Sequence, residues 1–499
     1  MTHPAYDELV RHWARLHRFF HLQAIAHWDR AAMMPAKGGE ARAQAMAEMD
    51  GLLHRLRTEP RLAGLLAAAA DEPLDDLAQA NLREMRREWT RANSIPEALV
   101  EAKSLATSRC ERGWELQRPA GDWAGFLENF RDVLRLAREE ARHLADASGL
   151  APYDALMDQF EPEITSREVD RVFGDLQSWL PRLVDAVRSK QSDEPVPTLH
   201  GPFETTKQRA LSLDVMRLLG FDFEAGRLDE SAHPFSGGVP EDTRLTTRYR
   251  DDDFVRSLMG TIHETGHARY EQNLPRDWLG QPVAHARSMG VHESQSLSFE
   301  MQLGRSRAFV ERLAPLVARH FGAQPGLEAG ELHCLLTRVR PDFIRVEADE
   351  LTYPAHVILR YGIEKRLIEG EVEAEDIPAL WDEGMARLLG VDTRGNFSNG
   401  CMQDVHWSAG LFGYFPCYTL GAMYAAQWFA ALRRERPHVD REIASGELAP
   451  VFDWLRENIW SQGSRWTTAE LVSRASGEPL NPLHFRRHLE TRYVGLTPA

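Results

Sequence analysis

Hydrophobic residues recur at intervals of three and four along most of this chain, which is the spacing of an amphipathic α-helix. The first such run begins at Leu9 and Trp13 and continues to Ile25. The pattern predicts further helices over 40–57, 74–91, 96–116, 126–136, 169–180, 204–219, 300–321, 331–338, 355–368, 378–389 and from about 419 onward. Charged residues of both signs occupy the opposite faces, as on solvated helices. We therefore expect a mostly α protein built from antiparallel helical hairpins.

One stretch departs from this helical spacing. Residues 227–235 and 242–250 alternate as strands do, and they flank the turn-forming run Gly237-Gly238-Val239-Pro240. Two such runs around a short glycine-containing connection are typical of a β-hairpin. The sequence therefore predicts one small antiparallel β element, placed directly before the helix that carries the most informative motif.

The segment 191–203 is the clearest interruption, because it is rich in proline and polar residues. The β element beyond it is too small to form a domain of its own. We therefore predict a single catalytic unit, 1–499, in which the helical segment 1–190 forms one wall of a cleft and the segment 204–499 binds a metal.

The motif is H-E-x-x-H, formed by His263, Glu264 and His267. Residues four apart in a helix lie on the same face, so the two imidazoles can reach one metal ion. Zinc accepts two histidines, a third protein ligand and a water in tetrahedral geometry. Glu264 points about 100° further round the helix. There it can take a proton from the water without binding the metal.

The third ligand lies outside this motif. An extended H-E-x-x-H-x-x-G-x-x-H pattern is excluded, because positions 270 and 273 are Tyr and Asn. Glu271 follows His267 by four residues and so lies on the same face of the helix. Three side chains spread along one straight helix cannot all reach one ion, so Glu271 either supports a ligand from behind or is solvated. Glu293, near the start of the next helix, is the better candidate. Its alternative role is that of a carboxylate stabilised by the helix dipole.

Composition narrows the class of protein further. The hydrophobic fraction of 43% and the charged fraction of 27% are those of a soluble protein, and no apolar run is long enough to span a membrane. The net charge of −16 disfavours nucleic acid as a partner. No secretory signal is visible, and the four cysteines form no C-x-x-C pair. These features predict a cytoplasmic protein.

Several short blocks occur in an order that resembles the carboxypeptidase Taq family of metallocarboxypeptidases. They are His233-Pro234-Phe235, Asp242-Thr243-Arg244-Leu245-Thr246, His263 to His267, His292-Glu293-Ser294-Gln295, Ile344-Arg345-Val346-Glu347-Ala348-Asp349 and Gly400-Cys401-Met402-Gln403-Asp404-Val405-His406-Trp407. Together they are far more specific than H-E-x-x-H alone.

The resemblance implies a large helical peptidase fold with a deep groove, similar to neurolysin-like and angiotensin-converting-enzyme-like peptidases. It implies a cytoplasmic homodimer that removes single amino acids from peptide C-termini with broad specificity. It also implies one Zn²⁺ per chain, or Co²⁺ as in some relatives. By this resemblance the ligands are His263, His267 and Glu293, and Glu264 is the general base.

Two further tasks need side chains. His406 and Tyr418 are candidates for the donor that stabilises the oxyanion; the alternatives are a loop cap for His406 and a core position for Tyr418. Arginine binds a free carboxylate best, and Arg345 is the first choice for this, with Arg244 second. Each arginine has the alternative of pairing with a neighbouring acid. The residue His233 either lines the cleft or forms a turn.

Two other functions are compatible with some features of the sequence. An oligopeptidase of the same broad fold cuts inside short peptides, and it differs from a carboxypeptidase in accepting peptides whose C-terminus is amidated. A non-catalytic helical scaffold, in which the motif is accidental, predicts no stoichiometric zinc and no effect of a chelator on stability.

Overall fold

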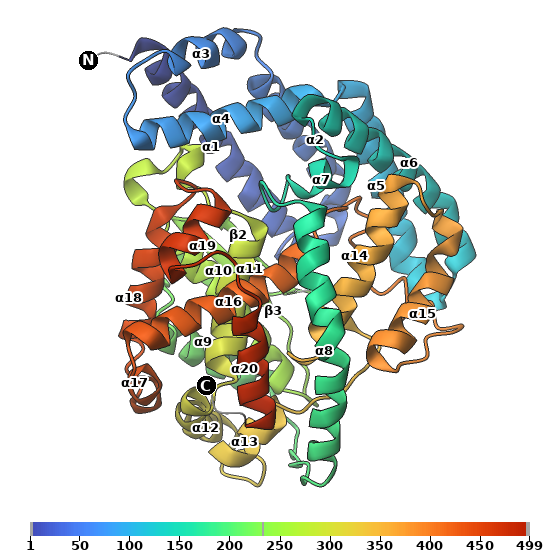
Figure 1. The fold of residues 1–499 in the computed structure, drawn as a ribbon, viewed down its shortest axis with the longest axis vertical. Helices are drawn as coiled ribbons and strands as arrows, with labels where there is room; N and C mark the ends of the chain where they lie inside the picture. Colours follow the sequence, from blue (N-terminus) through green and yellow to red (C-terminus); the bar gives the residue numbers. More distant parts are fainter. Residues whose placement is uncertain (1–2, 232–233, 496–499) are drawn as a thin grey trace.

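The computed structural model describes residues 3–231 and 234–495, and helices make up most of them (Figure 1). The α-helices are α1 (Pro4–Ala32), α2 (Gly39–Arg57), α3 (Arg61–Ala70), α4 (Asp76–Ser94), α5 (Glu97–Ala120), α6 (Trp123–Ser148), α7 (Pro152–Met157), α8 (Ser166–Ser192), α9 (Thr205–Leu218), α10 (Val255–Gln272), α11 (Met289–Leu297), α12 (Arg307–Phe321), α13 (Ala329–Leu336), α14 (Tyr353–Glu369), α15 (Ile377–Leu389), α16 (Pro416–Glu435), α17 (Val439–Ser445), α18 (Ala449–Asn458), α19 (Thr468–Ser476) and α20 (Leu483–Val494). The mostly helical class predicted from periodicity is confirmed. None of the helices described is long and apolar enough to cross a lipid bilayer.

The β element differs from the predicted hairpin. Its three strands, β1 (Gly226–Glu230), β2 (Ser236–Val239) and β3 (Asp242–Thr247), are ordered β1-β3-β2. The strands β2 and β3 form the antiparallel hairpin, but β1 pairs with β3 in parallel. The prediction treated 227–235 as one strand. It was wrong because the chain leaves the sheet after β1 and re-enters it on the other side of β3, which alternation of side chains cannot reveal.

One helical boundary and one short helix also differ from the prediction. A π-helical turn, η4 (Ser298–Gly304), follows α11 directly, and α12 begins only after it, so residues 300–321 are not one helix. The short helix α3 was not predicted. The segment after α8 contains no helix or strand until α9, as its proline content indicated.

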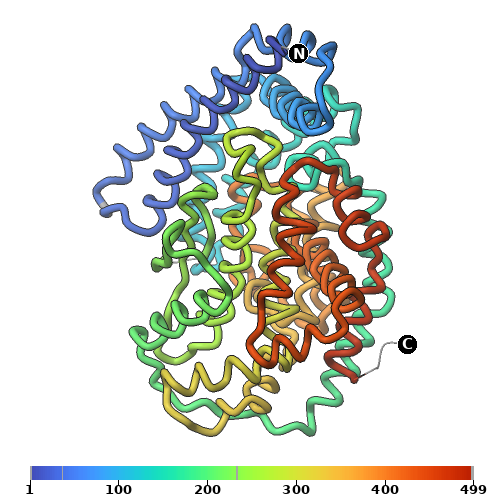
Figure 2. Tube along the Cα trace, turned by 90° about the vertical axis from the view of Figure 1, so that its left-hand side faces the viewer, coloured from blue at the N-terminus to red at the C-terminus, as the bar shows by residue number. Residues whose placement is uncertain are grey.

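Two large hydrophobic clusters hold the helices together. One cluster joins α5, α6 and α8 to α14 and α15, and the other joins α9, α10 and α12 to α16, α18 and α19. The smaller cluster of α1 to α4 forms one end of the molecule, seen in blue in Figures 1 and 2. The helix α11 packs along α16 and against α10, and thus lies in the interior of the second cluster.

The helix α20 is tied to the turn that follows α11. Arg492 donates hydrogen bonds to the backbone oxygen of Met301, at 2.5 Å, and to Glu350, at 2.7 Å. Glu350 is fully buried and also pairs with His488 of the same helix. The helix α20 therefore holds the backbone of η4 from outside that turn.

Candidate metal centre

The helix α10 carries His263 and His267 and is fixed by its own apolar face. Phe254, Leu258 and Ile262 are buried in the second cluster. The carboxylate of Asp253 accepts hydrogen bonds from the first backbone N–H groups of the helix, at 2.9 and 3.2 Å. These contacts fix the rotation of α10, so that both histidines face the groove, as their four-residue spacing predicted.

Close helix packing brings α11 over these histidines. A Cβ atom on Gly266 would lie only 2.5 Å from the backbone oxygen of Gln295 and 2.7 Å from Cα of Ser296. On the opposite side of α11, a Cβ atom on Gly421 of α16 would lie 2.8 Å from the side chain of Glu293. Glycine at both positions lets α11 sit between its neighbours at backbone contact, and this determines where Glu293 points.

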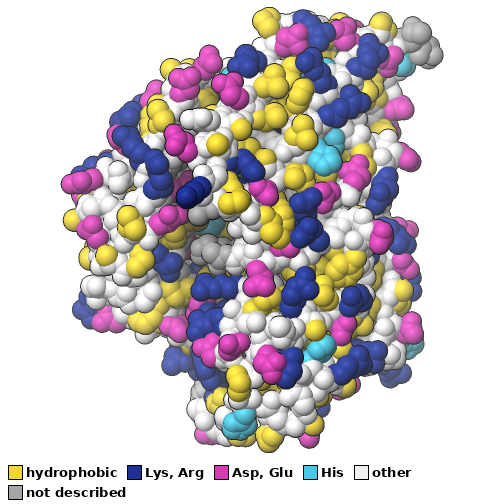
Figure 3. Space-filling view, turned by 180° about the vertical axis from the view of Figure 1, so that it is seen from behind, with side chains coloured by type: hydrophobic (Ala, Val, Ile, Leu, Met, Phe, Trp, Pro, Cys, Tyr) yellow, Lys and Arg dark blue, Asp and Glu magenta, His cyan; other side chains and the backbone are white. Residues whose placement is uncertain are grey.

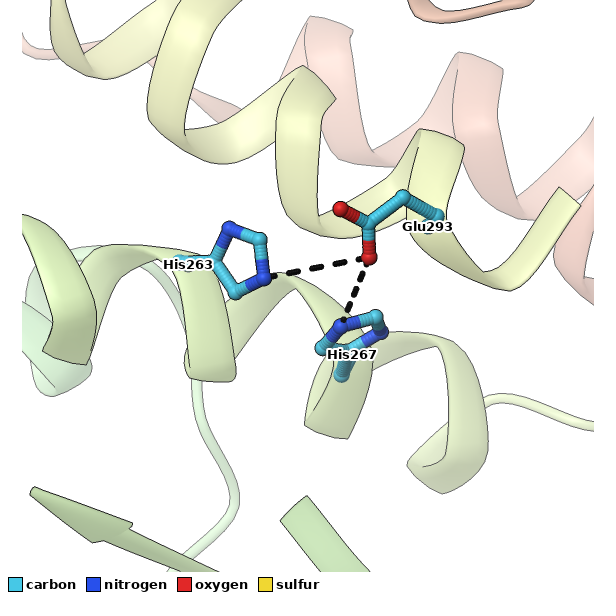
Figure 4. Close-up of side chains that lie close together, drawn as sticks. All are labelled: His263, His267 and Glu293. Carbon is cyan, nitrogen blue, oxygen red and sulfur yellow. Dashed lines mark ion pairs between the residues drawn. The ribbon is translucent and has the colours of Figure 1, made fainter. Parts of the chain in front are cut away.

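Three ligand atoms converge from these two helices (Figure 4). Oε2 of Glu293 lies 3.4 Å from Nε2 of His267 and 3.9 Å from Nε2 of His263. The candidate ligand atoms of the three residues all lie within 4.8 Å of one another. Tetrahedral zinc with bonds of about 2.0–2.2 Å needs ligand atoms roughly 3.4 Å apart. The donor set therefore fits a divalent cation that prefers imidazole and carboxylate.

The electrostatics of the cluster favour a cation. Burial by itself lowers the pKa of His263, but the carboxylates of Glu293 and Glu300 outweigh burial and raise that pKa to about 10. Nδ1 of His263 lies 3.0 Å from Oε2 of Glu300. Arg305 donates to the other oxygen of Glu300 at 2.7 Å, and its charge outweighs the effect of burial and lowers the pKa of Glu300 to about 2. The centre is thus a buried site with excess negative charge.

Glu264 lies beside the ligand candidates and lines the same groove. Its side chain is 7% exposed, and the hydroxyl group of Ser236 donates to its Oε2 at 2.7 Å. Ser236 begins β2, the edge strand of the sheet, so the sheet holds the carboxylate in place from outside α10. The arrangement leaves a carboxylate oxygen available to accept a proton in the groove.

The groove has a volume of about 1520 Å³ and is shared by distant parts of the chain. The helix α1 contributes Trp13 and His17, and α4 contributes Glu88. Figure 3 shows basic side chains around a hollow in the face drawn there. Several arginines line the groove, among them Arg248, Arg250, Arg256, Arg338 and Arg340.

His406 and Tyr418 are neighbours. Of these two residues, Tyr418 lines the groove and His406 lies behind it. Nε2 of His406 lies 3.0 Å from the hydroxyl oxygen of Tyr418. Burial lowers the pKa of His406 to about 3, so the imidazole is neutral. Burial raises the pKa of Tyr418, which keeps its hydroxyl proton at any working pH.

The two arginine candidates are already paired. Arg345 donates from Nε and Nη2 to Asp404, at 3.1 and 3.0 Å, and from Nη1 to Tyr353. Arg244 pairs with Asp242, at 2.7 and 2.6 Å, and does not line the groove. Asp404 therefore holds the guanidinium group of Arg345. His233 lies outside the described residues.

Comparison with known proteins agrees with this geometry. A family model described as Carboxypeptidase Taq (M32) metallopeptidase matches residues 8–493. The chain belongs to the carboxypeptidase Taq family. It is therefore a metallocarboxypeptidase, a hydrolase that acts on peptide bonds. The resemblance that the sequence blocks indicated is confirmed.

Relatives cover almost the whole carboxypeptidase. Thermostable carboxypeptidase 1 of Thermus thermophilus is 40% identical over 99% of both chains. The solved structure of Trypanosoma cruzi metallocarboxypeptidase 1 is 47% identical, with a TM-score of 0.97, and covers 99% of this chain and 100% of that one. A Pyrococcus furiosus carboxypeptidase structure is 31% identical, with a TM-score of 0.93 over 99% of both chains. The helical peptidase fold is therefore common to the family.

The sequence prediction missed two residues of this carboxypeptidase site. Ser236 directly follows the block His233-Pro234-Phe235, which drew attention to its own residues only. Glu300 follows Glu293 by seven residues, which is about two helical turns and therefore the same face. That spacing is the signal that could have identified Glu300 as a partner of the same centre.

Proposed function

We propose that this chain is a zinc-dependent carboxypeptidase that releases single C-terminal amino acids from peptides with broad side-chain specificity. The observation that supports this most is the convergence of His263, His267 and Glu293, with Glu264 beside them, at the floor of a groove. The large volume and mixed lining of the groove support tolerance of many side chains.

His263, His267 and Glu293 would hold one metal ion per chain. Zinc suits two imidazoles and one carboxylate, and cobalt accepts the same ligands. When bound, such a cation supplies a Lewis acid, which polarises a carbonyl oxygen and makes water more acidic. The remaining steps belong to side chains of the protein.

Glu264 is the proposed general base. Its carboxylate accepts a proton from the attacking water and returns it to the leaving amine. The hydroxyl group of Ser236 keeps the carboxylate in one rotamer, so that no reorientation is needed at the moment of transfer.

Tyr418 is the proposed donor to the oxyanion that develops on the scissile carbonyl. A phenol has one proton, so Tyr418 can donate into the groove only if it accepts from His406. The tautomer of His406 with its proton on Nε2 permits this. Nδ1 of His406 has no hydrogen-bond partner within the described part of the chain. In this tautomer Nδ1 carries no proton, so it is an unpaired acceptor rather than an unpaired donor. His406 therefore acts through Tyr418.

The free carboxylate of the substrate is bound, in our proposal, by arginines that line the groove. Arg345 can contribute only the N–H groups that Asp404 and Tyr353 leave over. Arg248, Arg338 and Arg340 line the groove and form no ion pair with any of the residues described. We propose that they share the binding of the terminal carboxylate with Arg345, and that Arg244 acts indirectly, through the sheet.

The remaining expectations stay predictions. They are a homodimeric assembly, a cytoplasmic location, a wider similarity to neurolysin-like and angiotensin-converting-enzyme-like folds, and the division into a wall, 1–190, and a catalytic region, 204–499. The lining contributed by α1 and α4 supports that division. Peptides with a free C-terminus are the proposed substrates.

The test is hydrolysis of short peptides by zinc-loaded parent protein and by the Glu264→Gln variant. We expect the variant to keep one zinc per chain and to lose several orders of magnitude in kcat/KM, because a base and not a ligand is removed. C-terminal amidation of the peptides should abolish cleavage by the parent. Full activity in the variant, or rapid cleavage of amidated peptides, would refute the proposal.

A further inference from the structure

A second imidazole stands directly behind His267. Nδ1 of His292 lies 2.6 Å from Nδ1 of His267, and Nε2 of His292 lies 2.8 Å from Oε1 of Glu271. His292 precedes Glu293 on α11, and Glu271 follows His267 by one turn of α10. A chain of hydrogen bonds therefore starts and ends on α10 and passes through α11.

The chemistry of the three groups fixes the direction of these hydrogen bonds. A carboxylate only accepts, so His292 donates to Glu271 from Nε2. The tautomer of His292 with its proton on Nε2 has a lone pair on Nδ1, which accepts from Nδ1–H of His267. Nε2 of His267 is consequently unprotonated, and this is the atom that lies 3.4 Å from Oε2 of Glu293.

We infer that His292 and Glu271 are positioning residues that hold His267 in its metal-binding tautomer and orientation through the His267–His292–Glu271 hydrogen-bond chain. The inference rests on the proposed function of the metal centre. The other imidazole has a shorter version of the same support, because Glu300 contacts Nδ1 of His263 directly, at 3.0 Å. A partner of this kind orients a ligand ring and increases its affinity for the metal.

His292 has no competing role as a ligand. Both of its ring nitrogens are engaged, and among the residues described the atoms that converge for a metal belong to His263, His267 and Glu293. The side chain of Glu271 is 27% exposed and lines the groove, so its carboxylate faces water on one side. The remaining alternative is that Glu271 acts on the centre by its charge alone, without His292.

The experiment measures the zinc dissociation constant of the full-length apoprotein by competition with a chromogenic chelator. His292→Phe keeps a ring of similar size without nitrogen atoms, and we expect it to raise the constant about 10- to 100-fold. Glu271→Gln keeps the shape of the side chain, but an amide can donate as well as accept, so it no longer fixes the direction of the hydrogen bonds. We therefore expect a smaller rise in the zinc dissociation constant. The matched control is His320→Phe. His320 also pairs with a carboxylate, that of Asp214 at 3.0 Å, but lies outside the groove lining, and its loss should leave zinc affinity unchanged.

The double variant distinguishes an effect through the hydrogen bonds His267–His292–Glu271 from an effect of the charge of Glu271 alone. In the His292→Phe background, Glu271→Gln should cause no further loss of affinity, because the connection to His267 is already broken. Additive losses, or a dissociation constant for His292→Phe equal to that of the parent, would overturn the inference. If His292→Phe fails to fold by circular dichroism, Glu271→Gln alone decides, and unchanged affinity in it is then the contrary result. A parent that binds no stoichiometric zinc would refute the proposed function instead.

Discussion

Gly266 is the position where a single methyl group should disturb the metal centre most. Ordinary van der Waals contact begins near 3.4 Å, and the added Cβ of Gly266→Ala would lie 2.5 Å from the backbone oxygen of Gln295. The helix α11 must therefore move away by about 0.9 Å, and Glu293 moves with it. The neighbour is backbone and not a flexible side chain, so rotamer changes cannot relieve the contact.

A displacement of about 1 Å in a catalytic group can lower the rate about 100-fold. We expect Gly266→Ala to lower kcat/KM by about that factor and to weaken zinc binding, and overpacking should destabilise the fold by about 1–3 kcal/mol. Peptide hydrolysis, chelator competition and thermal unfolding measure these three effects on one preparation.

Gly174→Ala provides the control. Gly174 lies exposed in the middle of α8, and a Cβ atom there would meet nothing within 4 Å. This variant should keep full activity and gain about 0.5–1 kcal/mol of stability, because alanine favours the helix. Parental kcat/KM and zinc affinity in a folded Gly266→Ala protein would refute the argument that backbone contact between α10 and α11 places Glu293.

Three further predictions concern neighbouring groups. Ser236→Ala should lower kcat about tenfold at unchanged zinc content, with recovery in Ser236→Thr; loss of zinc instead would show a structural role. Tyr418→Phe should lower kcat about 100- to 1,000-fold with little change in KM, and a change confined to KM would contradict its role as a donor. Burial raises the pKa of Glu364 to about 7, so the folded state holds this proton more tightly than the unfolded state does. The contribution of Glu364 to the free energy of unfolding should therefore fall by about 3 kcal/mol as the pH rises from 4.5 to 7. Denaturant titrations should show this as a pH-dependent difference between the parent and Glu364→Gln, and a difference that does not change with pH would contradict the assignment.

Sequence patterns correctly predicted the features that depend on residues close together along the chain, such as the helices and the faces they present. The shared face of His263 and His267 and the apolar face of α10 both follow from helical periodicity. The position of Glu293 depends on packing between α10, α11 and α16. The sequence suggested Glu293 from its place near the start of the next helix and left the helix-dipole role open, and the family resemblance favoured the ligand role.

Pairings between residues far apart in the sequence were the part of the structure that sequence patterns predicted least well. The alternative for Arg345 was a pair with a neighbouring acid. The acid two residues away, Glu347, pairs with Arg256 instead, and the partner of Arg345 is the distant Asp404. The predicted hairpin was incomplete for the same reason, because β1 pairs in parallel with β3, a strand that does not follow it directly along the chain. Such contacts are decided by tertiary structure, where propensity carries little information.

The bond from Arg492 to the turn after α11 has a consequence for biosynthesis. A chain still on the ribosome without α20 lacks the guanidinium that holds the backbone of η4, the turn that carries Glu300. The support of His263 is thus complete only once α20 lies against η4. A nascent chain therefore gains this support only after Arg492 has been synthesised and α20 has formed.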